Sequence, residues 1–188
     1  SLAAATVLAT KWDRQSPFVN PMCGSATVAI EALMIATNRR PGLYRKNYSF
    51  MHVTGYDPTY YNEQAQKLQD QILEAPHLKV IATDISEDAI NISRINAGIA
   101  GAEHLIEFEV CDFAETKMPE TPGIIYFNPE YGDRLGEVTE LETTYARIGD
   151  FLKKKCQGYL GYIFTGNLDL AKKIGLKASR RIEFYTST

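Results

Sequence analysis

Apolar runs of strand length alternate with segments of helical periodicity along most of the chain, and this alternation limits the possible folds more than any other feature. The predicted strands are residues 17–20, 79–83, 105–110, 123–127, 159–164 and 181–185. The predicted helices are residues 2–11, 25–38, 137–155 and 168–174, and a helix opened by Ser86 and Asp88 with Ala89, Ile92 and Ile95 at helical spacing. Nearly continuous apolar strands of this kind pair in parallel beneath helices on both faces. We therefore expect an α/β fold with a doubly wound, mostly parallel sheet.

One segment, residues 42–78, interrupts the alternation and is expected to form an insertion after the first long helix of the sheet. It is rich in aromatic residues up to Tyr61 and continues as a predicted polar helix over residues 62–74. Aromatic side chains can stack on nucleic-acid bases, but those of an insertion more commonly pack with one another. We expect a small aromatic core here and keep base stacking as the alternative.

Size and cysteine content predict a single domain in a reducing, cytoplasmic environment. The chain has 188 residues, of which 45% are hydrophobic, enough for one core. Cys23, Cys111 and Cys156 match no paired ligand spacing, which argues against a disulfide framework and against zinc. The most apolar run, residues 28–37, is interrupted by Glu31 and is too short for a bilayer. We expect neither a metal nor a membrane partner.

The net charge of −3 argues against a surface that holds a polyanion by charge alone, because Lys and Arg contacts to phosphate supply most non-specific nucleic-acid affinity. Cations do gather locally, and the patches are Arg39, Arg40, Arg45 and Lys46, then residues 153–155, then Lys172, Lys173, Lys177, Arg180 and Arg181. A solvated face is the simplest interpretation of each patch. We expect most of the grip on any nucleic acid to come from a region outside this chain.

A turn of small residues follows the first predicted strand and reads N-P-M-C-G-S-A-T over residues 20–27. Small residues let a ligand approach the backbone where a helix begins and its N–H groups are free. A dinucleotide site needs G-x-G-x-x-G, and a Walker loop needs G-x-x-x-x-G-K-[ST]; the sequence contains neither at this turn. The turn predicts a ligand site that serves neither a nicotinamide cofactor nor ATP hydrolysis.

Two acidic residues close the next two strands, Asp84 after the second and Asp112 after the third. In a parallel sheet both positions face the crevice where ligands bind. A carboxylate in the first place can accept hydrogen bonds from ribose hydroxyls, and one in the second can accept from the amine of adenine. Each could instead cap a helix or a turn, but together behind the turn they indicate an adenosine pocket.

The most specific string, Asn128-Pro129-Glu130-Tyr131-Gly132, follows the fourth predicted strand. An N-P-P-Y tetrapeptide at this place is typical of methyltransferases that act on planar nitrogens, and Glu130 is the one departure. The whole chain resembles the RNA methylase family that follows a THUMP domain, which includes enzymes that form N2-methylguanine in ribosomal and transfer RNA. That family has D-P-F/M-C-G-S-G-T at the turn, so Asn20 and Ala26 also depart, and N-P-P-Y-G-x-R at the string that ends here at Arg134.

The resemblance implies a Rossmann-like methyltransferase domain with S-adenosyl-L-methionine as its cofactor. The cofactor-binding residues that it implies are Asn20, Pro21, Cys23, Gly24, Ser25, Thr27, Asp84, Ile85, Cys111, Asp112, Phe113 and Asn128. The implied catalytic residues are Asn128, Pro129 and Tyr131, and the implied substrate contacts are Glu130, Tyr131 and Arg134. The family also has an upstream THUMP-type RNA-binding domain, which we expect to lie outside this chain.

The activity implied by the resemblance is methylation of an exocyclic amine of a nucleobase in RNA, with guanine N2 of ribosomal RNA favoured. The Asn128 side-chain oxygen and the Pro129 carbonyl would accept the two N–H bonds of the amine and favour its tetrahedral transition state. Tyr131 would stack on the base. Three alternatives stay open: a DNA adenine-N6 methyltransferase, a protein glutamine methyltransferase, and a non-catalytic RNA-binding domain.

Glu130 is the departure on which the choice of base could depend. An ionised Glu130 that points inward could accept hydrogen bonds from the N1–H and N2–H₂ groups of guanine, whereas the unprotonated N1 of adenine would repel it. The alternative interpretation is a solvent-exposed side chain or an ion pair with Arg134, which contributes little energy.

Overall fold

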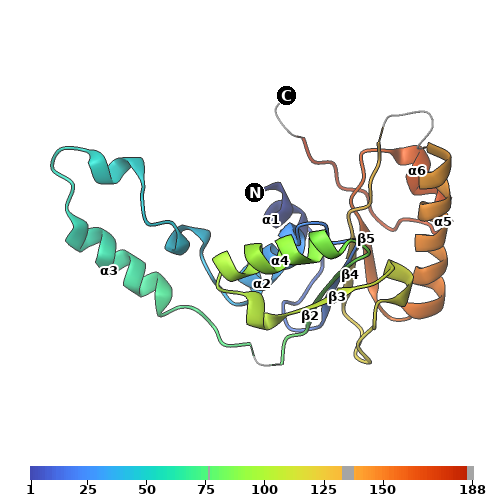
Figure 1. Cartoon of the computed structure of the whole chain (residues 1–188), viewed down its shortest axis with the longest axis horizontal. Coiled ribbons are helices and arrows are strands. Elements are labelled where there is room, and N and C mark those ends of the chain that lie inside the picture. Colours follow the sequence, from blue (N-terminus) through green and yellow to red (C-terminus); the bar gives the residue numbers. More distant parts are fainter. Residues whose placement is uncertain (76, 133–137, 186–188) are drawn as a thin grey trace.

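The computed structural model describes residues 1–75, 77–132 and 138–185. Their strands form one five-stranded parallel sheet in the order β3-β2-β1-β4-β5 (Figure 1). The strands are β1 (Phe18–Pro21), β2 (Val80–Asp84), β3 (Ile106–Val110), β4 (Ile124–Phe127) and β5 (Leu160–Ile163). The expected α/β fold with a doubly wound, parallel sheet is confirmed.

Helices cover both faces of this sheet, and side chains alternate between two cores. The helices are α1 (Leu2–Leu8), α2 (Thr27–Ala36), α3 (Pro58–Gln69), α4 (Glu87–Ile99), α5 (Val138–Lys155) and α6 (Leu168–Lys173), with short 3₁₀ turns η1 (Pro41–Tyr44), η2 (Ser49–His52), η3 (Glu103–Leu105) and η4 (Phe113–Glu115). On β1, Phe18 packs into the core shared with α1 and α2, whereas Val19 packs into the core shared with α5. This alternation follows from the two-residue period of a strand.

The parallel register brings the ends of the strands to one edge. Asn20 of β1 lies opposite Ala82 of β2, and Asp84 at the end of β2 lies opposite Val110. Backbone contact on the other side of β1 is close, because a Cβ at Gly123 would lie only 2.0 Å from the Pro17 carbonyl oxygen. The turns after β1, β2, β3 and β4 therefore open on the same side of the sheet, where ligands of such folds bind.

Helix α4 turns a different face to the sheet from the one that bears Ala89, Ile92 and Ile95. In α4, Ser86 caps the helix as predicted, with its hydroxyl accepting from the Ala89 amide at 3.2 Å. The side chains that face the sheet are nevertheless Ile90, Ser93 and Ala97, and Ile95 is 64% exposed. The helix carries isoleucines on two sides, so spacing alone selected the solvent side.

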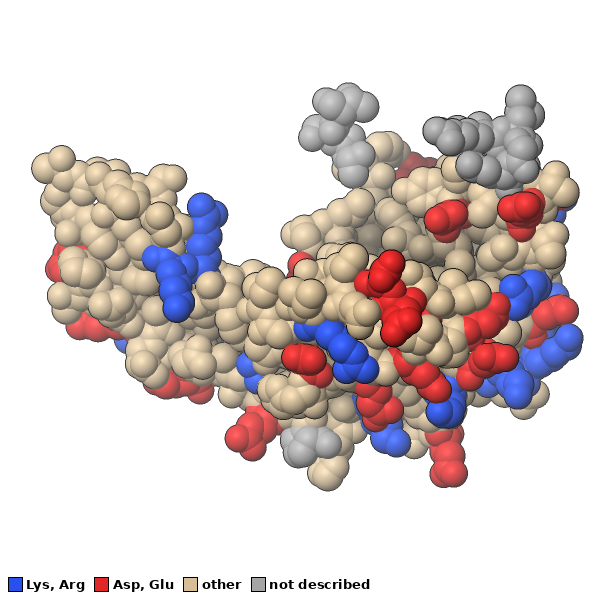
Figure 2. Space-filling view, viewed as in Figure 1, with Lys and Arg blue, Asp and Glu red and all other residues tan. Residues whose placement is uncertain are grey.

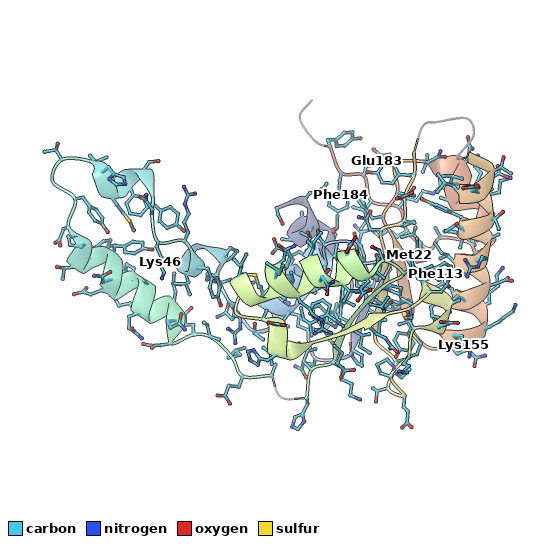
Figure 3. The ribbon with its side chains drawn as sticks, viewed as in Figure 1. Met22, Lys46, Phe113, Lys155, Glu183 and Phe184 are labelled. Carbon is cyan, nitrogen blue, oxygen red and sulfur yellow. The ribbon has the colours of Figure 1, made fainter. Side chains whose placement is uncertain are left out.

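The strand predicted over residues 181–185 is wrong. These residues are described without strand structure, and all but Phe184 are exposed. The Phe184 ring packs against Phe164 at the end of β5, with ring centroids 6.2 Å apart (Figure 3). Side-chain packing of one ring, rather than a ladder of backbone hydrogen bonds, brings this segment back to the sheet.

The insertion forms a lobe that projects away from the sheet (Figure 1). Its two ends are tied together after α2, where the Leu73 amide donates to the Thr37 carbonyl at 2.9 Å and the Asn38 side chain donates to the Gln71 carbonyl at 3.0 Å. The lobe contains an aromatic cluster formed by Tyr48, Phe50, Tyr56 and Tyr61, with neighbouring ring centroids 5.2–6.3 Å apart. The expected small aromatic core is present.

Among the described residues, no helix is both long and apolar enough to cross a membrane.

Candidate active site

The turn after β1 has a backbone that reverses its handedness at alternate residues. Met22, Gly24 and Ala26 have φ values of 54°, 56° and 56°. Glycine adopts this left-handed region freely, whereas alanine pays roughly 1–2 kcal/mol there. Ala26, which stands where the related family has glycine, is fully buried at the start of α2 and has no side-chain cap. Among the described residues, the cap position of α2 therefore supplies no side-chain acceptor to the first N–H groups of the helix.

Side chains from β2 and α4 hold this turn in place. The Asp84 carboxylate accepts from the Gly24 amide at 2.9 Å through Oδ2 and from the Ser86 amide at 3.0 Å through Oδ1. The Ser93 hydroxyl donates to the Gly24 carbonyl at 2.8 Å, and the Asn96 side chain donates to the Ser25 carbonyl at 3.2 Å. Asp84 therefore links the end of β2 to the turn, as the adenosine-pocket prediction requires, and keeps acceptor capacity on both oxygens.

Asn20 joins the turn to β4. Its side-chain amide donates to the Tyr126 carbonyl at 2.9 Å, and this bond identifies which end of the amide is nitrogen. The other end, Oδ1, is buried and has no hydrogen-bond partner among the described residues. A buried acceptor without a donor is costly, so this oxygen is suited to a ligand that brings an N–H or O–H group.

The Cys23 thiol in the same turn is not a nucleophile. Burial raises its pKa to about 12, and the charge of the nearby Asp84 carboxylate adds to the rise. A thiol with this pKa stays protonated at neutral pH. Cys23 therefore contributes its shape and backbone to the turn, in keeping with a reaction that needs no covalent intermediate.

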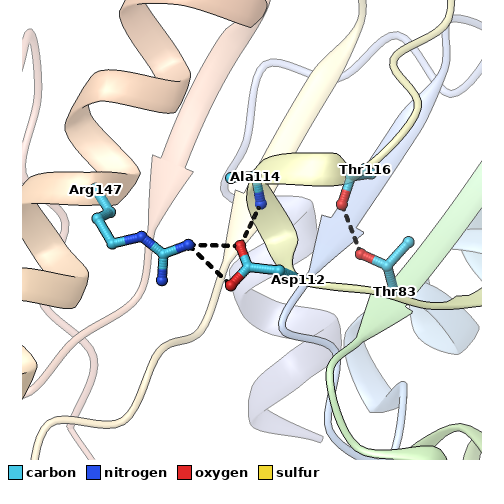
Figure 4. Close-up of polar contacts among 5 residues, drawn as sticks. All are labelled: Thr83, Asp112, Ala114, Thr116 and Arg147. Carbon is cyan, nitrogen blue, oxygen red and sulfur yellow. Dashed lines mark hydrogen bonds and ion pairs between the residues drawn. The ribbon is translucent and has the colours of Figure 1, made fainter.

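Asp112, after β3, is held by an arginine that sequence reasoning did not single out. One Nη atom of Arg147, on α5, lies 2.8 Å from each carboxylate oxygen, and the Ala114 amide donates to Oδ1 at 2.9 Å (Figure 4). The Arg147 guanidinium also lies over the Phe113 ring, 4.9 Å from its centroid. Three contacts occupy this carboxylate, which leaves about one acceptor position of the roughly four it has.

This environment moves the pKa of Asp112. Desolvation alone would raise it, but hydrogen bonds from Arg147 and from the Ala114 amide outweigh burial and place the pKa below its ordinary value. A depressed carboxyl pKa stabilises the folded state above the pKa of the unfolded chain, and that stabilisation is lost as the pH falls through the folded-state pKa.

We expect Arg147→Met to lower the free energy of unfolding by about 0.2–1 kcal/mol at pH 7, the range for a partly exposed ion pair. The difference from the wild type should narrow as the pH falls below the ordinary carboxyl range and through the lowered folded-state pKa of Asp112. Urea unfolding at a series of pH values measures it. A difference that is the same at pH 7 and pH 3 would contradict a stabilising role for the ion pair.

The other predicted cofactor residues differ in how accessible they are. Ile85 is 73% exposed directly after Asp84, at the edge of the sheet where the turns open. Cys111 is half-buried. Phe113 is instead a core residue, because its ring packs edge-on against Phe127 and Phe151. Its side chain is therefore not available to a ligand.

The N-P-E-Y string leaves the end of β4 at the same edge of the sheet. Asn128 and Glu130 are exposed, Pro129 is buried, and Tyr131 is 42% exposed. The hydroxyl of the fully buried Tyr145 donates to the Glu130 carbonyl at 3.2 Å and hydrogen-bonds to Thr165 at 2.8 Å. Tyr145 thus ties the string to α5 and to the segment after β5. Arg134 lies outside the described residues.

The Tyr131 ring lies against Gly166, just after β5. A Cβ at Gly166 would lie 3.1 Å from ring atoms Cδ2 and Cε2 of Tyr131, closer than ordinary van der Waals contact. The absence of a side chain at Gly166 therefore sets the place of the Tyr131 ring.

We expect Gly166→Ala to displace the Tyr131 ring by a few tenths of an ångström. It should lower the kcat of the methyl transfer that the sequence resemblance implies roughly 3- to 10-fold, because small misplacements at a reacting centre are costly. Cofactor affinity and melting temperature should change little. Gly161→Ala is the matched control, since its Cβ would be at an ordinary 3.4 Å from Leu152. Equal kcat values for the two variants would show that the ring position does not matter.

Sequence reasoning missed several residues that hold the site: Ser93, Asn96, Tyr145, Arg147, Thr165 and Gly166. None of them stood out in the sequence, because the face of α4 that Ser93 shares with Ile90 and Ala97 is identified as the inner face only by the structure. No group of three or more His, Cys, Asp or Glu side chains that could hold a metal ion occurs in the described part of the chain.

Comparisons with known proteins agree with this geometry. A family model described as RMKL-like, methyltransferase domain matches residues 1–187. The Ribosomal RNA large subunit methyltransferase K/L of Syntrophotalea carbinolica is 36% identical over 98% of this chain, but the match covers 27% of that relative. The chain thus spans about a quarter of the length of the curated relatives it matches.

Solved structures show the same fold. SMU.472, a candidate methyltransferase complexed with SAH, superposes with a TM-score of 0.90 and 27% identity over 100% of this chain and 49% of its own. A protein from Listeria monocytogenes, titled a predicted N6-adenine-specific DNA methylase, has a TM-score of 0.90 and 29% identity over 98% of this chain and 48% of its own.

Proposed function

The chain belongs to the family of RMKL-like methyltransferase domains, and on that basis we propose that it transfers a methyl group from S-adenosylmethionine to an exocyclic amine of a nucleobase in RNA. The favoured position is guanine N2 of large-subunit ribosomal RNA, in the cytoplasm. The names of the curated relatives support the RNA, and the SAH complex of a structural neighbour supports the cofactor.

One observation carries the proposal: the Asn20 side chain hydrogen-bonds to the Tyr126 carbonyl, two residues before Asn128. The turn suited to a cofactor and the string suited to an amine are therefore linked directly through the backbone of β4. Methyl transfer needs donor and acceptor in line and in contact. A shared anchor between the two sites favours that geometry.

The groups at the turn fit S-adenosylmethionine. The uncapped start of α2 can bind a carboxylate, and the unpartnered Oδ1 of Asn20 can accept from an ammonium group. Asp84 retains acceptor positions for two ribose hydroxyls, and Asp112 retains about one for the adenine amine. Exposed Ile85 offers an apolar surface to the adenine ring.

The cofactor would supply an electrophilic methyl group; the residues after β4 would prepare the amine. The lone pair of guanine N2 is delocalised into the ring, so the site must localise it. Asn128 Oδ1 and the Pro129 carbonyl would accept the two N–H bonds and favour a tetrahedral, partly positive nitrogen more in the transition state than in the ground state. Tyr131, held against Gly166, would stack on the base and orient its plane.

We expect Glu130→Pro, which restores the family's string, to leave rate and choice of base within about threefold if the exposed Glu130 side chain points to solvent. A fall on guanine, or new methylation of adenine, would instead assign a base-reading role to its carboxylate. Methylation of guanine- and adenine-containing RNAs of matched sequence measures both. Cofactor affinity serves as the control for folding.

The experiment that tests the function is methylation of total RNA by the purified protein with labelled S-adenosylmethionine, followed by mass spectrometry of the nucleosides. We expect N2-methylguanosine. N6-methyladenosine in DNA alone, or methylglutamine in a peptide arm, would overturn the proposal in favour of a DNA or protein methyltransferase. If calorimetry detected no binding of S-adenosylmethionine, the result would favour the alternative of a non-catalytic RNA-binding domain.

A further inference from the structure

We propose that residues 39–52, which we term the basic segment, form a surface of the lobe that binds the phosphate backbone of the RNA whose base enters the candidate active site. The inference rests on the proposed function for the identity of the RNA, and on the charge, packing and position of the lobe for the surface itself.

Charge is segregated between the basic segment, which begins three residues before the insertion, and the rest of the insertion. The basic segment contains Arg39, Arg40, Arg45 and Lys46 and no acidic residue, in a chain whose net charge is −3. The rest of the insertion has the opposite balance, with Asp57, Glu63, Asp70 and Glu74 against Lys67 alone. Cations without neighbouring carboxylates attract phosphate most strongly, because no internal pair competes.

The exposed cations of the basic segment are available to bind phosphate. Arg40, Arg45 and Lys46 are exposed, and within the described ranges none of them forms an ion pair. The Arg45 guanidinium lies over the Tyr48 ring at 4.8 Å, and only its Nε donates, to the Asn47 carbonyl at 2.7 Å. Among the described residues, neither Nη group of Arg45 has a hydrogen-bond partner, so both can bind a phosphate.

The aromatic cluster makes the segment a pre-formed surface. Tyr48 stacks on Phe50 with ring centroids 5.2 Å apart and also contacts Tyr61 of α3. The Tyr48 hydroxyl donates to the Gly42 carbonyl at 2.8 Å, which closes the segment on itself. A surface that is ordered before binding loses less entropy when it binds. This cluster gives the cations a rigid base.

The segment faces the rest of the molecule. Figure 2 shows a hollow between the lobe and the body, with cations on the side of the lobe that borders the hollow and carboxylates on its outer and lower sides. Lys46 lies on the lobe in Figure 3. The trace after β4, which carries the N-P-E-Y string, rises on the same upper side of the body (Figure 1).

The mouth of the candidate active site cannot supply this grip. The first turn of α4 and the string after β4 expose the carboxylates of Glu87, Asp88 and Glu130. The one cation of α4, Arg94, lies farther along the helix, where it donates to the Phe108 carbonyl at 3.3 Å and lies over the Phe108 ring. Carboxylates repel phosphates, so an RNA that delivers a base to Tyr131 must be held elsewhere. The basic segment is the nearest part of the chain in sequence to the site's first helix that bears cations without acids.

The test compares the double variant Arg45→Ala/Lys46→Ala with the wild type in methylation of RNA at several salt concentrations. We expect the KM for RNA to rise about 10-fold, while kcat at saturating RNA and the KM for S-adenosylmethionine stay within about twofold. The slope of log affinity against log salt should flatten by about 0.7 for each lost contact to single-stranded RNA.

Two further variants separate this proposal from a general charge effect. Lys67→Ala removes a cation of the same lobe, on α3, whose neighbours include Glu63 one turn earlier and the C-cap residue Asp70. It should leave the KM for RNA unchanged. Arg45→Lys/Lys46→Arg keeps both charges and should retain the wild-type salt slope.

The two proposals fail differently. A wild-type protein that binds no S-adenosylmethionine, or that methylates DNA or a peptide but no RNA, overturns the proposed function. A wild-type protein that methylates RNA, with an unchanged KM and salt slope in the double variant or an equal loss in Lys67→Ala, overturns the basic segment as an RNA-binding surface and leaves the lobe for another partner.

Discussion

Asp84→Ala is expected to weaken S-adenosylmethionine binding about 10- to 150-fold, the equivalent of the ~1.5–3 kcal/mol that hydrogen bonds to a charged group contribute. The Asp84 carboxylate already accepts from the Gly24 and Ser86 amides at 2.9 and 3.0 Å. It therefore does two things at once, since it shapes the turn and offers its other lone pairs to the ribose. Isothermal calorimetry with S-adenosylmethionine measures the loss.

Asp84→Asn separates those two roles. The asparagine keeps the size of the side chain and one acceptor for the Gly24 or Ser86 amide, but it loses the charge. We expect an intermediate loss of affinity and a melting temperature close to that of the wild type. If Asp84→Ala bound S-adenosylmethionine with wild-type affinity, Asp84 would not bind the ribose, and the assignment of an adenosine pocket to this part of the site would be wrong.

The sheet was predictable because each strand repeats the same physical signal. A buried parallel strand is apolar on both faces, so β1, β2 and β4 stand out as short apolar runs between helical segments. The signal weakens at the edges of the sheet, where β3 and β5 are only partly buried. Their approximate positions were still correct, because β3 follows a predicted helix and β5 lies between two predicted helices.

Two local predictions were wrong for the same reason: the spacing of apolar residues does not specify the element against which a segment packs. Residues 181–185 alternate in polarity like a strand, yet only Phe184 reaches the end of β5. On α4, isoleucines occupy both sides of the helix, and tertiary packing selects Ile90 rather than Ile95. Periodicity identifies an element; it cannot say which of two apolar stripes the sheet will cover.

The residues in the turns of the candidate site could be predicted from the sequence, whereas the residues that hold these turns in place could not. Residues such as Asp84 and Asn128 follow strands, so topology alone brings them to one edge. Ser93 bonds to Gly24, 69 residues away in the sequence, and Arg147 bonds to Asp112, 35 residues away. Contacts at such separations depend on the packing of α4 and α5 against the sheet, which sequence periodicity does not specify. The ion pair of Arg147 with Asp112 is the most consequential of them.

Asn128→Ala is expected to lower methyl-transfer kcat about 10²- to 10³-fold, by analogy with the loss of one preorganised group that stabilises a transition state. The Asn128 side chain is exposed after β4, so its removal should not change the melting temperature. The KM for RNA should change much less than kcat, because the interaction is strongest in the transition state. Single-turnover kinetics at saturating cofactor isolate the chemical step.

Asn128→Asp is the matched variant, because it keeps the shape and the acceptor oxygen but removes the N–H₂ donor. If Oδ1 accepts from the amine, the aspartate should retain far more activity than the alanine, since the developing positive charge on nitrogen favours an anionic acceptor. If the side chain acts instead as a donor, the aspartate should be as impaired as the alanine. Equal impairment of both variants would therefore contradict the role given to Asn128, and with it the mechanism in which the end of β4 localises the lone pair of the amine.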